Sequence, residues 1–551
     1  MNDFKLSSLP EDKLNEISSS LDSNSVFGVI GVCGIVGNLV ARVLLDNGFK
    51  VLGTDMASKE DCKFKSAFED YDIEIFYGGH PEEFFADLDY VFVPPSLPKT
   101  AKVWDIIESK NIQILEVEDI FKLFAPDKPV ICISGTNGKT TTTTLLKHIA
   151  YTSGIKPCEH NLEGLQGNTE FIPSLQSRLN GDVAILESGT LGNVGSIKSI
   201  ATLSNASYGL LTNITLDHLD EDHDFIDYAR VKGELVKVID EHEGTLVVNS
   251  DDPIIAGLLK EMNYQGNIIR FGLEGEISKV DTKPCWCGNE VEINEIISGV
   301  GTFDCENADM RDCGVKYIKP DYLAKNISIK DRTFTLVAPD GEFEFKLAID
   351  GLHNVYNSLG TIVLAREALD ISYEDIQKAL LTFTGVAGRM ELMGEVDSKT
   401  VMVDYAHNPA GVETTLHELS KLYDRISVVI TVSSESGHEG DLDILDSALG
   451  NVKHIIPSSP ASNIAAKEVL ENAKSKDYKG AYSFDELNEI FVFPEEAPEE
   501  STLVNSNAGT NAKGVMDGFK TALKTDVDLV TCIGEAAFKF DENLREYCKT
   551  H

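Results

Sequence analysis

The residue types best suited to bind phosphate lie in one stretch, Ile131-Cys-Ile-Ser-Gly-Thr-Asn-Gly-Lys-Thr-Thr141. An apolar run leads into a glycine loop that ends in Gly-Lys-Thr, and apolar residues with helical spacing follow. Backbone N–H groups of such a loop and the positive end of the next helix can point at one anion, and Lys139 adds a charge. The predicted phosphate site consists of Gly135, Thr136, Asn137, Gly138, Lys139, Thr140 and Thr141. The loop is shorter than the general pattern. The alternative is a structural turn, since a glycine loop with a lysine can also be one.

A second glycine motif, Gly31-Val-Cys-Gly34-Ile-Val-Gly37, follows an apolar run near the start of the chain, and Asp55 ends the next such run. The pattern resembles a dinucleotide fingerprint, although its spacing is G-x-x-G-x-x-G rather than G-x-G-x-x-G. It indicates a second nucleotide site at a helix N-terminus. The alternative is that the glycines only allow a helix to pack closely on a strand.

Alternating strands and helices are needed to position these loops. Between residues 26 and 125, short β-branched runs alternate with helical stretches, which is typical of a parallel sheet with crossover helices. The strands predicted there are Val26–Ile30, Lys50–Thr54, Glu74–Phe76, Tyr90–Val93 and Gln113–Glu116. Asp119 to Asp127 is predicted to be a linker, after which the phosphate loop begins another α/β unit.

A glycine-rich boundary at residues 383–388 begins a third α/β segment. Its predicted strands are Thr400–Val403, Ile426–Thr431, His454–Ile456 and Leu529–Ile533. The fold class is therefore predicted to be α/β, with domains at residues 1–125, 126–385 and 386–551. Residues 273–325 interrupt the second domain with a polar, cysteine-bearing insertion.

The length, charge and cysteine content of the chain argue against several classes of function. At 551 residues the chain is too long for one core, and its net charge of −42 argues against binding to nucleic acid or an anionic membrane. The apolar run from Val26 to Leu45 is interrupted by Asn38 and Arg42 and fits a strand, turn and helix better than a membrane span. The opening residues resemble no secretory signal, and the scattered cysteines resemble buried thiols, so we expect a cytoplasmic protein.

Seven short motifs follow the phosphate loop in order, and with it they resemble the ATP-dependent Mur ligase superfamily over nearly the whole chain from Val26. They are Glu187-Ser-Gly-Thr, Thr212-Asn-Ile-Thr-Leu-Asp-His218, Tyr228-Ala-Arg-Val-Lys232, Val248-Asn249-Ser-Asp-Asp, Gly351-Leu-His-Asn354-Val, Gly388-Arg389-Met-Glu and Asp404-Tyr-Ala-His-Asn-Pro. This superfamily comprises muramyl peptide ligases, folylpolyglutamate synthases and cyanophycin synthetases. The resemblance implies an N-terminal Rossmann-like domain, a central P-loop ATPase domain and a C-terminal Rossmann-like domain.

The resemblance also implies amide synthesis through an acyl phosphate, with ATP and Mg²⁺ as cofactors. Lys139 would bridge the phosphates, Thr140 and Glu187 would bind a first Mg²⁺, and His218 would bind a second one. The residues assigned to ATP are Asn249 and Asn354 at the adenine, Arg389 at the phosphates, and Asp404 at the ribose or at an interdomain contact. Taken alone, Glu187 could equally cap a helix and His218 could be a hydrogen-bonded core histidine.

Lys232 is the most specific residue prediction. An ordinary ammonium beside two Mg²⁺ ions would be repelled, and in much of the superfamily the matching lysine is carbamylated and so becomes an anion. The alternative is a surface lysine paired with a nearby acid on a helix.

The insertion carries Cys285, Cys287, Cys305 and Cys313. Four thiolates suit tetrahedral Zn²⁺, and such a site can hold together an insertion with little apolar core. The spacing departs from the usual pattern, so unligated thiols are the alternative. A cysteine insertion at this point resembles a branch of the superfamily with archaeal members and bacterial lipid II amidating ligases.

The N-terminal domain resembles the one with which related ligases bind UDP-activated precursors, which would assign Gly31, Gly34, Gly37 and Asp55 to the precursor. The acidity and the cysteine insertion favour an archaeal pseudomurein peptide ligase, whose partners would be a UDP-linked peptide precursor and a free amino acid. The alternatives are a bacterial-type peptidoglycan ligase or amidating subunit, another amide ligase of the superfamily, and an NAD-binding oxidoreductase. Neither the amino acid nor the oligomeric state follows from the sequence.

Overall fold

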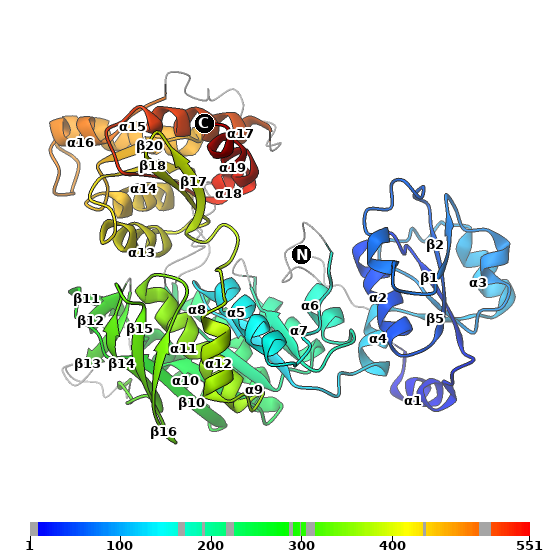
Figure 1. Ribbon diagram of the computed structural model, residues 1–551. Coiled ribbons are helices and arrows are strands. Elements are labelled where there is room, and N and C mark those ends of the chain that lie inside the picture. Colours follow the sequence, from blue (N-terminus) through cyan, green and yellow to red (C-terminus); the bar gives the residue numbers. More distant parts are fainter. Residues whose placement is uncertain are drawn as a thin grey trace.

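Three sheets, each built from a separate stretch of the chain, organise the molecule, and a small fourth sheet is attached to the middle one (Figure 1). The structure is a computed structural model that describes residues 9–162, 171–189, 193–215, 225–285, 290–297, 299–304, 315–432, 437–494 and 509–551. The α/β fold class predicted from the sequence is confirmed.

The N-terminal sheet is wholly parallel, with strand order β3-β2-β1-β4-β5. Its strands are β1 (Val26–Ile30), β2 (Lys50–Asp55), β3 (Glu74–Tyr77), β4 (Tyr90–Phe92) and β5 (Gln113–Leu115), which confirms the five predicted strands. The helices around it are α1 (Glu11–Ser20), α2 (Ile35–Asp46), α3 (Val103–Lys110) and α4 (Val117–Leu123). The strand order reverses direction at β1, so the loops after β1 and β4 border a crevice.

The middle domain carries an eight-stranded sheet of order β16-β15-β14-β10-β9-β8-β6-β7. The strands are β6 (Val130–Ser134), β7 (Ala184–Glu187), β8 (Tyr208–Leu211), β9 (Thr245–Asn249), β10 (Asn267–Leu273), β14 (Tyr322–Ser328), β15 (Thr333–Ala338) and β16 (Gly341–Lys346). The helices are α5 (Lys139–Thr152), α6 (Ile172–Gln176), α7 (Ser196–Leu203), α8 (Phe225–Lys232), α9 (Glu234–Glu241), α10 (Pro253–Glu261), α11 (Leu352–Glu367) and α12 (Tyr373–Leu380). Parallel pairing from β7 to β14 brings the carboxyl ends of these strands to one edge.

Between β10 and β14, the insertion forms an antiparallel sheet of β11 (Lys279–Pro284), β12 (Glu290–Ile297) and β13 (Val300–Asp304). The C-terminal sheet has the order β17-β18-β21-β19-β20 and is parallel except for β17. Its strands are β17 (Glu391–Val396), β18 (Lys399–Asp404), β19 (Ile426–Ile430), β20 (His454–Pro457) and β21 (Leu529–Ile533). Its helices are α13 (Pro409–Ser420), α14 (Gly437–Ala448), α15 (Pro460–Ser475), α16 (Phe484–Ile490), α17 (Gly509–Leu523), α18 (Glu535–Lys539) and α19 (Asp541–Thr550).

Two expectations are wrong. The segment from Asp119 to Asp127 is not wholly a linker, because α4 occupies its first half. Asp119 closes a capping box with Glu116 at the start of that helix, and capping satisfies N–H groups that a linker would leave to water. Cys33 and Cys62 are joined by a disulfide, since the loop after β1 and the segment after β2 lie side by side, so they are not buried free thiols.

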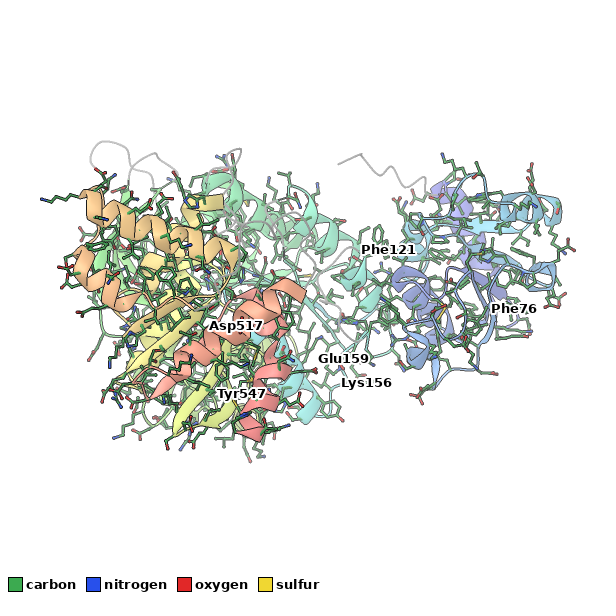
Figure 2. The ribbon with its side chains drawn as sticks, turned by 90° about the horizontal axis from the view of Figure 1, so that it is seen from above. Phe76, Phe121, Lys156, Glu159, Asp517 and Tyr547 are labelled. Atoms are coloured by element: carbon green, nitrogen blue, oxygen red, sulfur yellow. A yellow bond between two sulfur atoms is a disulfide. The ribbon has the colours of Figure 1, made fainter. Side chains whose placement is uncertain are left out.

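Buried arginines tie the N-terminal domain to the middle domain. The Arg178 guanidinium donates hydrogen bonds of 2.7 Å to the carbonyls of both Phe121 and Leu203, and Arg42 on α2 donates to the carbonyls of Glu159 and His160. Figure 2 places Phe121 where these two domains meet, whereas Phe76 lies farther out in the N-terminal domain. Within the described ranges, no helix is both long and apolar enough to cross a membrane.

Candidate functional site

A cavity of about 1420 Å³ lies between the middle and C-terminal domains. The phosphate loop and the start of α5 line one part of it, and residues before and after β18 line the facing part. Side chains from β10, α11 and the insertion complete the wall. The cavity therefore lies at the carboxyl edge of a parallel sheet, where α/β proteins bind ligands.

The loop after β6 is held from behind by the segment that follows β8. The Thr136 N–H donates to the Asn213 carbonyl (2.7 Å), and the Asn137 N–H donates to Asn213 Oδ1 (3.0 Å). Thr212 Oγ1 and Asn213 Nδ2 both donate to the Asn137 carbonyl, at 2.7 and 3.0 Å. Because these groups satisfy the loop's outward-facing atoms, its conformation is set before any ligand arrives.

Two glycines let neighbouring chains approach this loop closely. Gly138 has φ of +84°, and a Cβ there would overlap Asn357 Oδ1 on α11. Gly135 has φ of +139°, and a Cβ there would overlap Thr212 Oγ1. The left-handed backbone and the lack of space both require glycine, which creates a cradle at the N-terminus of α5 that fits a phosphate group.

The charged groups at the cradle come from α5 and β7. Lys139 Nζ donates to the Thr136 carbonyl (2.7 Å), so the lysine folds back over its own loop. Thr140, Thr141 and Glu187 all line the cavity. Burial lowers the pKa of Lys147, two turns along α5, while Glu159 and Glu187 act in the opposite direction. Half-buried oxygens beside a helix N-terminus fit Mg²⁺ bound together with phosphates.

Lys232 ends α8 with only 1% of its surface exposed, so the alternative of a surface lysine is wrong. Its Nζ lies 4.9 Å from the centroid of the Tyr228 ring. The Tyr228 hydroxyl in turn lies 3.4 Å from Thr136 Oγ1, so α8 packs directly behind the phosphate loop. The third predicted metal ligand, His218, lies outside the described residues.

The two asparagines predicted to contact adenine both line the cavity, and both form hydrogen bonds with backbone groups. Asn249 Nδ2 donates to the Thr212 carbonyl, and Asn249 Oδ1 accepts from the Asp251 N–H, each at 3.0 Å. Asn354 Nδ2 donates to the Asp350 carbonyl (2.7 Å), and Asn354 Oδ1 accepts from Asn357 (3.1 Å). These bonds fix the orientation of both amides at the cavity wall.

In the C-terminal domain, Arg389 lies over the Tyr405 ring, with 4.5 Å between its Cζ and the ring centroid. Asp404 is buried at the end of β18 and accepts from the N–H groups of Met390 (2.7 Å) and Ala406 (2.8 Å) and from Thr415 Oγ1 (3.2 Å). Asp404 thus holds the loop that carries Arg389 against α13. His407 lines the cavity next to Tyr405.

Helix α13 of the C-terminal domain contacts the middle domain near both of its ends. At its start, Asn408 Nδ2 donates to Asn137 Oδ1 of the phosphate loop (3.2 Å). Near its end, the buried Glu418 accepts the Leu352 N–H (3.1 Å), which puts a carboxylate at the positive end of α11. The sequence did not predict these contacts. Its one indication was that Asn408 belongs to the motif beginning at Asp404.

Asn357 was also missed, although it lies three residues after Asn354 and so shares a helix face with it. It packs against Gly138 and lies 3.5 Å from Thr142 Oγ1. His353, another cavity residue, has a buried Nδ1 without a hydrogen-bond partner among the described residues, and burial lowers the pKa of its imidazole. Both residues lie within or next to the motif that begins at Gly351, and this position was the sequence signal for them.

The second glycine motif lies at the N-terminus of α2, far from this cavity in the fold (Figure 1). Gly31 has φ of +76°, Gly34 is the N-cap of α2, and a Cβ on Gly37 would overlap the Gly31 carbonyl. Asp55 accepts hydrogen bonds from the N–H groups of Cys33 and Ala57, each at 2.9 Å, so this carboxylate braces the loop itself.

Of the four insertion cysteines, Cys285 is buried in a small apolar cluster, and Cys287, Cys305 and Cys313 lie outside the described residues.

Comparison with known proteins agrees with this geometry. Residues 133–365 match the family model of the Mur ligase middle domain, and residues 388–504 match that of the Mur ligase glutamate ligase domain. A UDP-N-acetylmuramate–L-alanine ligase of Clostridium botulinum is 30% identical over 408 residues, 73% of this chain and 75% of that protein. A pseudomurein peptide ligase type C from Methanothermus fervidus is 33% identical with a TM-score of 0.79, covering 95% of this chain and 100% of that one. A MurF ligase from Thermotoga maritima in complex with ADP shares the fold, at 14% identity and a TM-score of 0.54 over 93% of this chain and 98% of that one.

The substitution Gly138→Ala tests the phosphate cradle. We expect the affinity for ATP to fall by about tenfold or more, because the left-handed backbone costs about 1–2 kcal/mol and the new methyl group displaces Asn357. Isothermal titration calorimetry measures the affinity.

Gly154→Ala is the matched control, since Gly154 has φ of +83° but nothing within 4 Å of an added Cβ. It should lose some stability and keep its affinity for ATP. Equal ATP affinities in the two variants would contradict the assignment of the cradle.

Proposed function

The chain belongs to the Mur ligase family of ATP-dependent amide ligases, and from this premise we propose that it adds an amino acid to a UDP-activated cell-wall peptide precursor of the pseudomurein type. The observation that carries the proposal is one cavity that joins a phosphate loop to the C-terminal domain. The similarity of nearly the whole chain to a pseudomurein peptide ligase supports this substrate class. Such a cavity can bring a triphosphate, an acid and an amine together.

The proposed reaction has two substitutions. A carboxylate oxygen of the precursor attacks the γ-phosphorus of ATP, the bond to the β-phosphate oxygen breaks, and ADP leaves an acyl phosphate behind. The neutral amine then attacks the acyl carbon, inorganic phosphate leaves, and the amide nitrogen loses a proton. The loop N–H groups, the positive end of α5 and Lys139 stabilise the negative charge that the first step concentrates.

We assign a first Mg²⁺ to Thr140 and Glu187 and a second one to His218. Bound Mg²⁺ would reduce the repulsion between the carboxylate and the triphosphate. We assign Asn249 and Asn354 to the base and Arg389 to the phosphates. Asp404 is a positioning residue, because its carboxylate holds the loop that carries Arg389.

We propose that Lys232 is carbamylated. A buried lysine directly behind the phosphate loop adds positive charge where Mg²⁺ is expected, and carbamylation turns that charge into an anion. The resulting carbamate can attract the metal ions and hold them for the phosphates.

Two further sites complete the proposal. The cradle of Gly31, Gly34 and Gly37 at the start of α2, braced by Asp55, fits the pyrophosphate of a UDP-linked precursor. Structural Zn²⁺ held by Cys285, Cys287, Cys305 and Cys313 would explain how the insertion is stabilised, since its apolar cluster is small.

The first alternative within the family is a ligase of peptidoglycan type, which the similarity to a UDP-N-acetylmuramate–L-alanine ligase favours. The NAD-binding oxidoreductase would use the N-terminal sheet alone and leaves the phosphate loop and the interdomain cavity without a role.

An assay of phosphate release tests the function. UDP-linked glutamyl and muramyl precursors are each combined with ATP, Mg²⁺ and a panel of amino acids. We expect one glutamyl precursor and amino acid pair to release phosphate well above the background of ATP alone. Lys139→Ala should reduce that rate by about 10³-fold, because it removes a charge from the transition state. A variant that keeps the full rate would exclude this mechanism, and activity with muramyl precursors alone would favour the peptidoglycan alternative.

Carbamylation of Lys232 has its own test. Lys232→Ala should lose about 10²-fold in rate, and added formate or acetate should partly restore it by supplying the missing anion. The exposed Lys237 on α9 provides the control, since Lys237→Ala should keep its activity and respond to neither acid. Loss of activity at Lys232 that no small carboxylate restores would contradict carbamylation.

Metal analysis of protein purified without added zinc tests the insertion site. We expect about one zinc per chain, lost in the double variant Cys285→Ser/Cys287→Ser, because a tetrahedral site needs all four thiolates. The double variant Cys132→Ser/Cys532→Ser, at buried cysteines outside the insertion, should keep its zinc. Unchanged zinc content in the first variant would end this proposal.

A further inference from the structure

The insertion is part of the wall of the cavity as well as a structural addition. Ile297 at the end of β12 and Val300 at the start of β13 line it together with Phe271 of β10 and Tyr356 of α11. β10 lies three strands from β6 in the sheet order, and three spacings of about 4.8 Å place it about 14 Å from the strand that leads into the phosphate loop. The cavity thus has an apolar end well separated from its anion-binding end.

The turn that presents these residues is fixed by buried hydrogen bonds. Glu295 Oε2 accepts the Gly299 N–H (2.7 Å), and the Gly301 N–H donates to the Asp251 carbonyl (2.9 Å). Asp251 belongs to the same turn as Asn249, so the hairpin is bonded to the segment that follows β9. A wall held in this way is formed before a ligand binds and costs little to order.

Charges on the far side of the hairpin hold it in place. Lys279 Nζ lies 3.7 Å from Glu295 Oε1 and 3.5 Å from Glu413 Oε1 on α13, so the insertion also contacts the C-terminal domain. Lys283 Nζ is buried and faces Asp252 and Glu295. None of these charged side chains lines the cavity, and the four residues named above that do line it here are uncharged.

A nucleoside triphosphate has one anionic end and one flat, weakly polar end. N–H groups and Lys139 suit the first end, whereas Phe271, Ile297 and Val300 offer contact area to the second. We propose that Ile297 and Val300 contact the nucleobase and so set the enzyme's selectivity among nucleoside triphosphates. This inference rests on the proposed function, since it requires ATP to occupy the cavity.

The double variant Ile297→Ala/Val300→Ala tests the inference by titration calorimetry with Mg²⁺. We expect the Kd for ATP to rise by about tenfold, because two apolar contacts to the base are removed. The Kd for inorganic tripolyphosphate, which has no base, should stay unchanged. The preference for ATP over GTP should fall, since the wall no longer fits one base closely.

Val280→Ala is the matched control, because Val280 lies in the same insertion with 62% of its surface exposed and is not among the cavity residues. Val300→Thr keeps the shape of the side chain but adds a hydroxyl at a buried position, so circular dichroism must first show that the variant folds. The folded variant should bind ATP several-fold more weakly, with its affinity for tripolyphosphate unchanged. The inference would be overturned if the affinities for ATP and tripolyphosphate fell equally, or if both cavity variants kept the ATP affinity of the unmodified protein. Failure of the unmodified protein to bind either ligand would instead refute the proposed function.

Discussion

A phosphate loop can turn its N–H groups toward an anion only if other groups hold the rest of its backbone. Here the segment 212–215 does so, and its contacts with Asn137 and Thr136 determine where the N–H groups of the loop point. Asn357 on α11 closes the other side against Gly138. The whole site depends on this constraint, because an electrostatic cradle stabilises charge only when it needs no rearrangement during the reaction.

The same loop also joins two domains. Asn137, which is held by Asn213, meets Asn408 at the start of α13, and Glu418 near the end of that helix accepts an N–H group from α11. A single helix of the C-terminal domain therefore contacts both elements that line the proposed phosphate site. Asp404 holds the loop of Arg389 and α13 together, so a movement of α13 would carry Arg389 with it.

The insertion shows how a local addition becomes part of a shared site. Its hairpin is bonded to the turn after β9, its lysines face Glu295 and Asp252, and Lys279 reaches α13. Asp251 behind it is buried, and burial raises the pKa of its carboxyl to about 6 although the Leu273 N–H and the Tyr356 hydroxyl donate to it. These hydrogen bonds and charge pairs favour one arrangement of the insertion over others.

The sequence by itself determined the fold class, the nine strands predicted for the outer domains and the glycine loop before α5. These features are encoded locally, in the alternation of apolar runs and in the glycines that a turn requires, so neighbouring residues suffice to reveal them. The family followed from the resemblance of an ordered set of short motifs. Only the tertiary structure decided that α4 replaces part of the expected linker, that Cys33 pairs with Cys62, and that Lys232 is buried. The tertiary structure also decided which residues contact Gly138, Asn137 and the insertion hairpin. Each of these contacts joins residues from distant parts of the chain. Whether such residues meet depends on strand order and domain packing, which the local spacing of residues does not encode.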